Sequence, residues 1–388
     1  MPATPPIIVV AVDSFKGSLA AGAACTAIAR GVVRAMADAE LRLRAMADGG
    51  EGTLDAVLAA SAGSTRSSVR TRGADGRAID AAIGRLGDGG AIVEIAQVVG
   101  ITDDTAMATE ITARDTQGVG IVLRQLLDDG CREFAIGLGG SSTNDGGAGL
   151  LAALGVRFVD AANRIVAPTP RGLSSLARVD LAGLDPRLDQ SRMTIMSDVN
   201  NPLCGQQGAT SVFGPQKGAR ADAIAPIDAA LARYAALLED AFGRRAAQRA
   251  GAGAAGGLGF ALQLLGGEFR SGADVVADLN GLDAALAGAS WVITGEGRSD
   301  AQTLMRKAPC VVAERAHAQG VGVSLLSGAL DPAALAALDA VFDGCFALPP
   351  GPQSLAASIA NAPEWLADRA AAMTRLRFSA RRRSSRPA

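Results

Sequence analysis

Five loops of this 388-residue sequence combine carboxylate side chains with glycine directly after short apolar runs, and two of them also carry a basic side chain. The loops are DSFKGS (13–18), DGGEGT (48–53), GLGGSSTNDGGAG (137–149), DVNNPLCG (198–205) and EGRSDAQT (296–303). One such loop is explained as a helix cap, since Asp and Ser are favoured there, but five that each carry a carboxylate are not. Ligands of open parallel sheets bind outside the carboxyl ends of the strands. We therefore expect most of these loops to line one cleft.

The charged side chains of these loops, and of the segments FGPQKGA and MRKAP, are of two chemical kinds. The acidic ones are hard oxygen ligands that suit Mg²⁺, and the basic ones can neutralise phosphate oxygens. The acidic set is Asp13, Asp48, Asp198 and Glu296, and the basic set is Lys16, Lys217, Arg298 and Lys307. Together with a glycine loop for an anion, these groups are the components of phosphoryl transfer. A plain surface charge is the alternative for Lys16 and Arg298.

The loop at 137–149 has few side chains, which is typical of an anion site. It follows the apolar run 132–138, which predicts a buried strand, and it precedes a helical pattern that ends at Gly155. Glycine lets backbone N–H groups approach a ligand closely, and a helix N-terminus adds partial positive charge. The candidate phosphate-binding residues are Gly139, Gly140, Ser141, Ser142, Asn144 and Asp145. The alternative is a strained turn between strand and helix.

The order of the apolar runs predicts an α/β protein with two α/β domains. Residues 1–71 alternate between strand and helix, which indicates a parallel sheet with helices on its faces, and this rhythm returns from about residue 289. Between these parts, short strands with tight glycine turns open a different pattern. We expect one domain built from both chain ends, 1–71 and 287–388, and a second domain inserted at 72–286.

The composition excludes several classes of function. The net charge is −2 and aromatic residues make up 3%, so neither a basic face nor stacking residues for nucleic acid are evident. No apolar run reaches the ~18–20 residues of a membrane span, which speaks against a membrane partner. The five cysteines form no C-x-x-C pair and suit a reducing cytoplasm. Because His317 is the single histidine, histidine-based catalytic triads and metal sites are unsupported.

Seven segments together resemble the bacterial glycerate kinase family of type 1, the glycerate 2-kinases. They are DSFKGSLAA, AMADGGEGT, GLGGSSTNDGGAG, DVNNPLCG, VFGPQKGA, GAGAAGGLGFAL and VITGEGRSDAQTL, and they occur in the family's order over nearly the whole chain. The resemblance implies a flavodoxin-like parallel-sheet domain formed from both chain ends, and a second α/β domain. It implies ATP and Mg²⁺ as cofactors and D-glycerate as the small-molecule substrate, phosphorylated at its 2-hydroxyl group. A homodimer stays open as the oligomeric state.

The resemblance carries the family's motifs onto particular residues of this sequence. We hypothesise that Asp198 or Asp48 orients the glycerate hydroxyl group, and that Lys16 and Arg298 hold the substrate carboxylate or the transferring phosphoryl group. Asp48, Asp198 and Glu296 are the metal candidates. Further residues expected to bind substrate or phosphate are Asp13, Ser14, Ser18, Asn200, Lys217, Asp300 and Lys307.

Two segments depart from the family's pattern. ITARDTQGVG (111–120) stands where the family usually reads like ASTYGTG, which bears on acceptor choice, and QTLMRKAP (302–309) lacks the glycine that typically precedes Lys307. The alternatives are therefore a kinase for another small hydroxy acid or for the 3-hydroxyl group, and a non-catalytic homologue that binds a phosphorylated metabolite. A dehydrogenase is the weakest alternative, because GAGAAG (251–256) matches G-x-G-x-x-G without a preceding strand.

Overall fold

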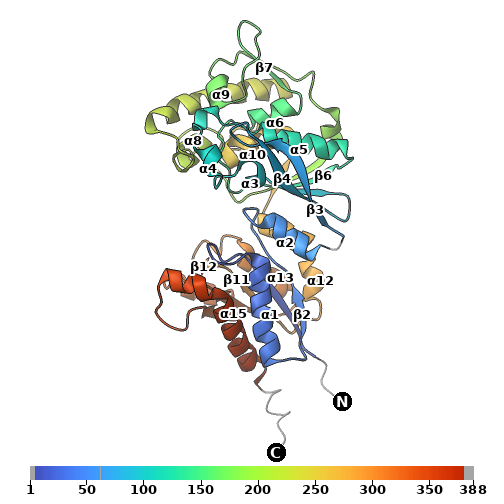
Figure 1. The fold of residues 1–388 in the computed structure, drawn as a ribbon, viewed down its shortest axis with the longest axis vertical. Helices are drawn as coiled ribbons and strands as arrows, with labels where there is room; N and C mark the ends of the chain where they lie inside the picture. The colour runs from blue at the N-terminus through green and yellow to red at the C-terminus, as the bar shows by residue number, and fades with distance from the viewer. Residues whose placement is uncertain (1–4, 62, 380–388) are drawn as a thin grey trace, which may run out of the picture. The chain divides into compact units, whose positions relative to one another are not determined.

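The chain forms two compact units, which the computed structural model describes for residues 5–61 and 63–379 (Figure 1). Of these described residues, 5–48, 55–61 and 273–379 belong to the first unit. The second unit comprises Gly49–Leu54 and Gly63–Gly272. Both units combine helices with a sheet, so the predicted α/β class with two α/β parts is confirmed.

The sheet of the first unit is entirely parallel. Its strands are β1 (Ile7–Val12), β2 (Glu40–Leu43), β11 (Trp291–Gly295), β13 (Val323–Ser327) and β15 (Gly344–Ala347). They lie in the order β15-β13-β11-β1-β2, with every adjacent pair parallel. Counted along the unit, this order is 2-1-3-4-5, which is the order of flavodoxin-like sheets. The predicted flavodoxin-like unit built from both chain ends is therefore confirmed.

Helices cover this sheet, and two of them from opposite ends of the chain pack together. They are α1 (Ala21–Ala35) and α15 (Leu355–Arg377), which lie side by side in Figure 1. A Cβ atom added at Gly31 of α1 would lie 2.1 Å from the carbonyl oxygen of Ala367 in α15, so glycine permits this close approach. The remaining helices that carry residues of this unit are α2 (Thr53–Ala60), α11 (Gly272–Leu279), α12 (Leu282–Leu286), α13 (Ala308–Ala318) and α14 (Leu335–Asp339).

The second unit contains a mixed six-stranded sheet. Its strands are β3 (Thr65–Arg72), β4 (Ala78–Arg85), β5 (Ala91–Glu94), β6 (Glu133–Gly137), β9 (Arg192–Met196) and β10 (Glu268–Arg270), in the order β10-β9-β6-β5-β4-β3. The pairs from β5 to β10 are parallel, whereas β3, β4 and β5 are joined antiparallel. The carboxyl ends of β6 and β9 therefore meet at one edge of the sheet.

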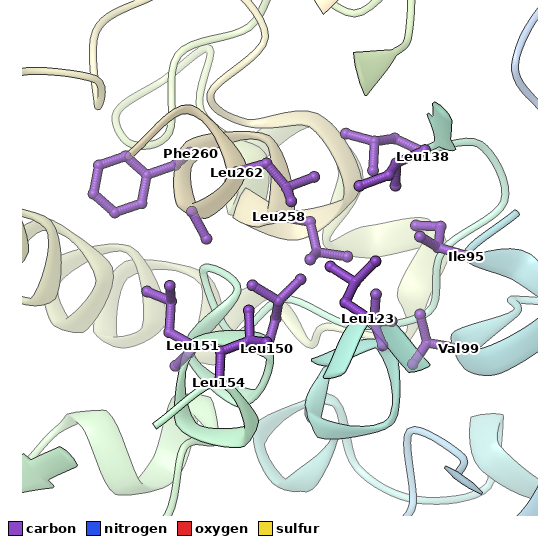
Figure 2. Packing of buried hydrophobic residues seen from close by; sticks show 14 of the residues in the cluster. Ile95, Val99, Leu123, Leu138, Leu150, Leu151, Leu154, Leu258, Phe260 and Leu262 are labelled. Atoms are coloured by element: carbon purple, nitrogen blue, oxygen red, sulfur yellow. The ribbon is translucent and has the colours of Figure 1, made fainter. Parts of the chain in front are cut away.

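Helices of the second unit enclose a large apolar core. Figure 2 shows Leu123 of α5 (Gln117–Asp128), Leu150 of α6 (Ala148–Ala153) and Leu258 of α10 (Leu258–Leu264) pointing toward one another. All three side chains are fully buried. The other α-helices and strands of this unit are α3 (Ala96–Val99), α4 (Asp104–Met107), α7 (Pro170–Leu173), α8 (Ala209–Phe213), α9 (Ala221–Phe242), β7 (Arg157–Val159) and β8 (Arg178–Asp180).

The first unit also contains a short parallel pair of strands, β12 (Arg298–Ser299) and β14 (Ala329–Leu330).

The strand β3 differs from its predicted place. The alternation of the first seventy residues predicts it as a parallel strand of the first sheet, but it pairs antiparallel with β4 in the second. A tight turn causes this pairing, because the N–H of Gly73 donates to the carbonyl of Arg77 at 2.8 Å and Gly76 has a φ of +84°. As a result, the second unit includes residues 63–71 and the first unit includes residues 273–286. The sequence predicts domain boundaries after residues 71 and 286 instead.

None of the helices in the described part of the chain has the combination of length and apolar character that a membrane span requires.

Candidate functional site

A cavity of about 620 Å³ lies at the carboxyl ends of the first unit's strands. Asp13 follows β1, Glu296 follows β11 and Gly328 follows β13, and all three line the cavity. In a sheet of order 2-1-3-4-5, the connections leave β1 and β11 in opposite directions, and ligands bind at such switch points. The topology alone thus places this cavity where a binding site is expected. Eight predicted site residues besides Asp13 line it: Ser14, Lys16, Ser18, Asp48, Glu296, Arg298, Asp300 and Lys307.

The acidic side chains of this cavity interact with one another. Burial, together with the neighbouring charges of Asp48 and Glu296, raises the pKa of Asp13 to about 7. Burial also raises the pKa of Glu296, against hydrogen bonds from the hydroxyl groups of Thr303 at 2.6 Å and Ser299 at 2.9 Å. The negative charges of Asp48 and Glu296 beside Asp13 favour a bound cation.

Basic side chains line the same cavity. Lys16 and Arg298 are exposed and Lys307 is half-buried. The guanidinium group of Arg298 is 3.2 Å from a carboxylate oxygen of Asp331, and the ammonium group of Lys307 is 3.4 Å from the side-chain oxygen of Gln302. Both cations keep further donor capacity, because guanidinium has five N–H groups and ammonium has three. Cations and carboxylates around one cavity are what a metal-bound polyphosphate requires.

Hydroxyl groups in the lining of this cavity, and buried ones behind the lining, support its walls. The hydroxyl group of Ser18 donates to the carbonyl of Ile359 in α15 at 2.9 Å, which ties the loop after β1 to that helix. The hydroxyl group of Ser299 lies 2.7 Å from that of Ser327, and it also donates to Glu296. Ser299, Thr303 and Ser327 were missing from the predicted site, although the first two belong to the quoted loop EGRSDAQT. Their role as donors to a buried carboxylate became visible only with the fold.

The second unit has a smaller cavity of about 250 Å³ at the carboxyl ends of β6 and β9. Gly139, Gly140 and Ser141 from the loop after β6 line it, together with Lys217. Lys217 is 2% exposed, and its ammonium group donates to the hydroxyl of Ser141 and to the carbonyl of Thr143, both at 2.8 Å. Burial and the charge of Arg114 lower the pKa of Lys217 to about 7, against the opposing effect of the Asp145 charge.

The start of α6 does not offer free amides to an anion. The carboxylate of Asp145 is fully buried and accepts hydrogen bonds from the N–H groups of Gly149 at 3.0 Å and Gly147 at 3.2 Å. It also accepts from the N–H of Thr116 at 2.9 Å and from its hydroxyl at 2.7 Å. The prediction that a ligand would use this helix terminus is therefore corrected, because Asp145 already satisfies the terminus from within the chain.

Most glycines of the loop at 137–149 serve close packing of the chain on itself. A Cβ atom at Gly139 would lie 2.5 Å from the Cα of Gly50, and one at Gly149 would lie 2.4 Å from the N of Gln117. Gly140, with a φ of +71°, has more room, since its nearest neighbour would be the Cβ of Ala96 at 3.4 Å. The alternative of a tight structural turn thus accounts for much of the glycine content, and Gly139, Gly140 and Ser141 are the part of the predicted phosphate site that lines the cavity.

Two other polar side chains of this loop are also turned inward. Ser142 and Asn144 are fully buried. The hydroxyl of Ser142 donates to the carbonyl of Val99 at 2.9 Å, and the amide of Asn144 donates to the hydroxyl of Thr210 at 2.9 Å. These contacts hold the loop from behind, so a direct contact of either side chain with a ligand stays a prediction.

The loop after β9 carries Asp198 and Asn200 as exposed side chains of the second unit. Asp48 and Glu296, the other metal candidates, belong to the first unit. No group of three or more His, Cys, Asp or Glu side chains at metal-binding spacing occurs among residues 5–61 and 63–379. That one ion is held by all three predicted ligands stays a prediction. The expectation that most of the five polar loops line one cleft also stays a prediction.

The two segments that depart from the family pattern are built into the fold. Arg114 is 1% exposed and donates to the carbonyl of Lys217, and Asp115 is 3% exposed, 3.6 Å from the guanidinium of Arg72. Burial raises the pKa of Asp115 to about 6. Arg306 has a φ of +61°, the left-handed region that favours glycine. Its guanidinium contacts Asp274 at 2.7 Å, an ion pair that glycine could not form.

Comparisons with known proteins identify the family to which the chain belongs. The model of the glycerate kinase family matches residues 8–377. The chain is 38% identical over 361 residues to the glycerate kinase of Bacillus subtilis (strain 168), covering 92% of this chain and 94% of the relative. It is 38% identical over 322 residues to the glycerate 2-kinase of Escherichia coli (strain K12), covering 82% and 84%. A crystal structure from Salmonella typhimurium LT2, provisionally named glycerate kinase 2, superposes with a TM-score of 0.87 at 37% identity, covering 97% of this chain and 100% of the other.

Proposed function

Since the chain belongs to the glycerate kinase family, we propose that it transfers the γ-phosphoryl group of ATP to the 2-hydroxyl group of D-glycerate, giving 2-phosphoglycerate and ADP. The observation that carries the proposal is the cavity of about 620 Å³, where Asp13, Asp48 and Glu296 share the lining with Lys16, Arg298 and Lys307. The name of the Escherichia coli relative supports the 2-hydroxyl group as the acceptor. We expect the reaction to occur in the cytoplasm, where ATP is supplied.

The carboxylates of this cavity fit a magnesium ion that arrives with ATP. Mg²⁺ in kinases is held by one or two carboxylates and by phosphate oxygens, with water completing its shell. Asp48 and Glu296 would hold it, and a cation there would also relieve the effect of their charges on the buried carboxyl group of Asp13. When bound, Mg²⁺ neutralises charge on the phosphates.

The chain's own residues supply the remaining parts of phosphoryl transfer. Lys16, Arg298 and Lys307 would bind the phosphate oxygens and stabilise the charge that spreads over the transferred group. Ser299 and Thr303 orient the carboxylate of Glu296 through their hydroxyl groups. The acceptor hydroxyl group would be oriented by one of the two predicted carboxylates, Asp48 or Asp198.

The product decides the proposal. We would incubate the protein with Mg-ATP and D-glycerate and follow ADP and the phosphorylated product by ³¹P NMR, and we expect a 2-phosphoglycerate signal. A 3-phosphoglycerate signal would overturn the choice of hydroxyl group and keep the kinase. Bound ATP without any product would favour another acceptor, or a homologue that binds phosphorylated metabolites without turnover.

The two candidates for orienting the acceptor can be separated by matched substitutions. Asp48→Asn and Asp198→Asn each remove one negative charge at nearly constant size. Substitution of the residue that orients the hydroxyl group should lower kcat by about 100-fold or more, which is a typical effect of losing a positioned acid–base group. An unchanged kcat in either variant would remove that residue from the proposed mechanism.

A further inference from the structure

Part of the lining of the 620 Å³ cavity is apolar, and it comes from the C-terminal part of the chain. It consists of Leu348 and Pro349 after β15 and of Leu355 and Ile359 in the first turns of α15. Leu355 is 76% exposed and Ile359 is 37% exposed, so apolar surface of the helix is accessible at the cavity. We name these four residues the apolar wall. Neither the charged loops nor the proposed phosphoryl transfer gives it a role.

The apolar wall is fixed beside the charged loop after β1. A Cβ atom added at Gly17 would lie 3.9 Å from the Cδ1 of Ile359, so this side chain lies against Gly17, which has a φ of +77°. The carbonyl of Ile359 accepts the hydrogen bond from the hydroxyl of Ser18 at 2.9 Å. The loop that carries Asp13 and Lys16 and the first turns of α15 are thus held together, and the cavity has a charged part and an apolar part.

Such a cavity matches a ligand that is itself charged at one end and apolar at the other. D-glycerate has a carboxylate and two hydroxyl groups on three carbons, so it offers almost no apolar surface to bury. A cavity of about 620 Å³ is also in the range of sites that enclose a whole drug-sized ligand. A purine nucleoside triphosphate combines a polyphosphate with a flat base of low polarity, and burying that base is favourable by about 25 cal/mol per Å².

We infer that the apolar wall binds the purine base of the nucleotide, while Lys16, Arg298 and Lys307 bind its phosphates. The inference rests on the proposed function, because it takes ATP as the phosphoryl donor. Gln353 and Ser358 line the same cavity and can exchange hydrogen bonds with the polar edge of a base. The C-terminal helix is therefore part of the nucleotide site as well as a cover for α1.

The test compares a ligand that has the base with one that lacks it. Affinities of Mg-ATP and of magnesium tripolyphosphate would be measured by isothermal titration calorimetry for the wild type, for Leu355→Gln and for the double variant with Ile359→Gln. The matched control is Leu376→Gln, which is on the same helix, is 68% exposed and lines a different cavity. We expect the double variant to bind Mg-ATP about tenfold or more weakly than the wild type. Its affinity for tripolyphosphate, and the affinity of the control variant for Mg-ATP, should stay within about twofold of the wild-type values.

Two results would overturn the inference. One is an unchanged affinity for Mg-ATP in both variants, and the other is an equal loss of affinity for Mg-ATP and for tripolyphosphate. Because Leu355 is so exposed, Leu355→Gln should keep the fold even where the double variant does not, and circular dichroism checks this. Steady-state kinetics with D-glycerate separate this inference from the proposed function. Turnover with an unchanged KM for ATP in the variants would overturn the base site alone, whereas base-dependent ATP binding without glycerate turnover would support the base site and overturn the kinase proposal.

Discussion

At the scale of single residues, the first unit brings the carboxyl groups of Asp13, Asp48 and Glu296 together in the lining of one cavity. Asp13 is half-buried at the end of β1, and like charges on Asp48 and Glu296 act on it. Burial and repulsion both disfavour its ionised form. Such strain is common at functional sites, where binding of a ligand of opposite charge relieves it. Residues that destabilise the free protein in this way are good candidates for the binding machinery.

The raised pKa of Asp13 predicts a specific dependence of stability on pH. The pKa of about 7 in the folded chain, against 3.8 for an ordinary aspartate, means that the folded state binds a proton more tightly than the unfolded state. This contribution is fully present below about pH 4 and is lost as the pH rises through about 7. Asp13→Asn should therefore exceed the wild type in free energy of unfolding at pH 7.5, by on the order of 2 kcal/mol, and should lose this advantage near pH 4.

Urea unfolding in the presence of EDTA measures this difference, since metal-free protein is needed to see the repulsion. Wild type and Asp13→Asn would be compared at several values of pH between 4 and 8. A variant that is less stable than the wild type at pH 7.5 would show that the Asp13 carboxylate forms net favourable contacts in the free protein.

At the scale of elements, the contact between α1 and α15 holds the C-terminal helix against the rest of the first unit. Gly31 lies where α15 comes closest, with the carbonyl oxygen and carbon of Ala367 at 2.1 and 2.8 Å from an added Cβ. Both atoms belong to rigid helix backbone and cannot turn away. The position of α15, and with it the apolar wall, thus depends on the absence of a side chain in α1.

A matched pair of substitutions in α1 tests this contact. Gly31→Ala should lower the free energy of unfolding by about 2–3 kcal/mol, because the two helices must separate. Gly22→Ala, in the same helix, meets no atom within 4 Å and should raise it by about 0.5–1 kcal/mol through helix propensity. Chemical denaturation provides both values. Equal effects of the two substitutions would mean that α1 and α15 do not approach as closely as described.

At the scale of the whole molecule, we propose that the two compact units are two domains, each with its own sheet and core. The first is discontinuous in sequence, because the sheet of β1, β2, β11, β13 and β15 needs both chain ends. The second has a core of buried side chains from β3 through α10. Two cores of this kind predict that unfolding is not a single two-state transition.

The tryptophans make this prediction testable without any substitution. Trp291 and Trp365, the two tryptophans of the chain, both belong to the first unit. Tryptophan fluorescence should therefore follow the unfolding of the first unit alone, whereas far-ultraviolet circular dichroism follows both units. We expect the two transitions not to coincide in urea, and Gly31→Ala should shift the fluorescence transition more than the other. Coincident transitions for both probes would favour one cooperative unit.

Much of the first unit's site could be predicted from the sequence because it depends on short-range patterns. An apolar run followed directly by a polar loop marks the carboxyl end of a buried strand, and Asp13 after β1 and Glu296 after β11 follow that rule. Chemical type then limits what each side chain can bind. The family resemblance, carried by loops in a fixed order, is confirmed by the family model and by the relatives.

Only the tertiary structure decided which polar groups face a cavity and which face the chain itself. Asp145 and Asp13 look alike in sequence, each beside glycine or serine after a strand, yet Asp145 is enclosed by amides of its own loop and Asp13 lines the 620 Å³ cavity. The partner of β3 and the contribution of α15 also depend on contacts between distant segments. Local sequence determines backbone preference and chemical type, but burial is set by long-range packing, which no short window of sequence contains.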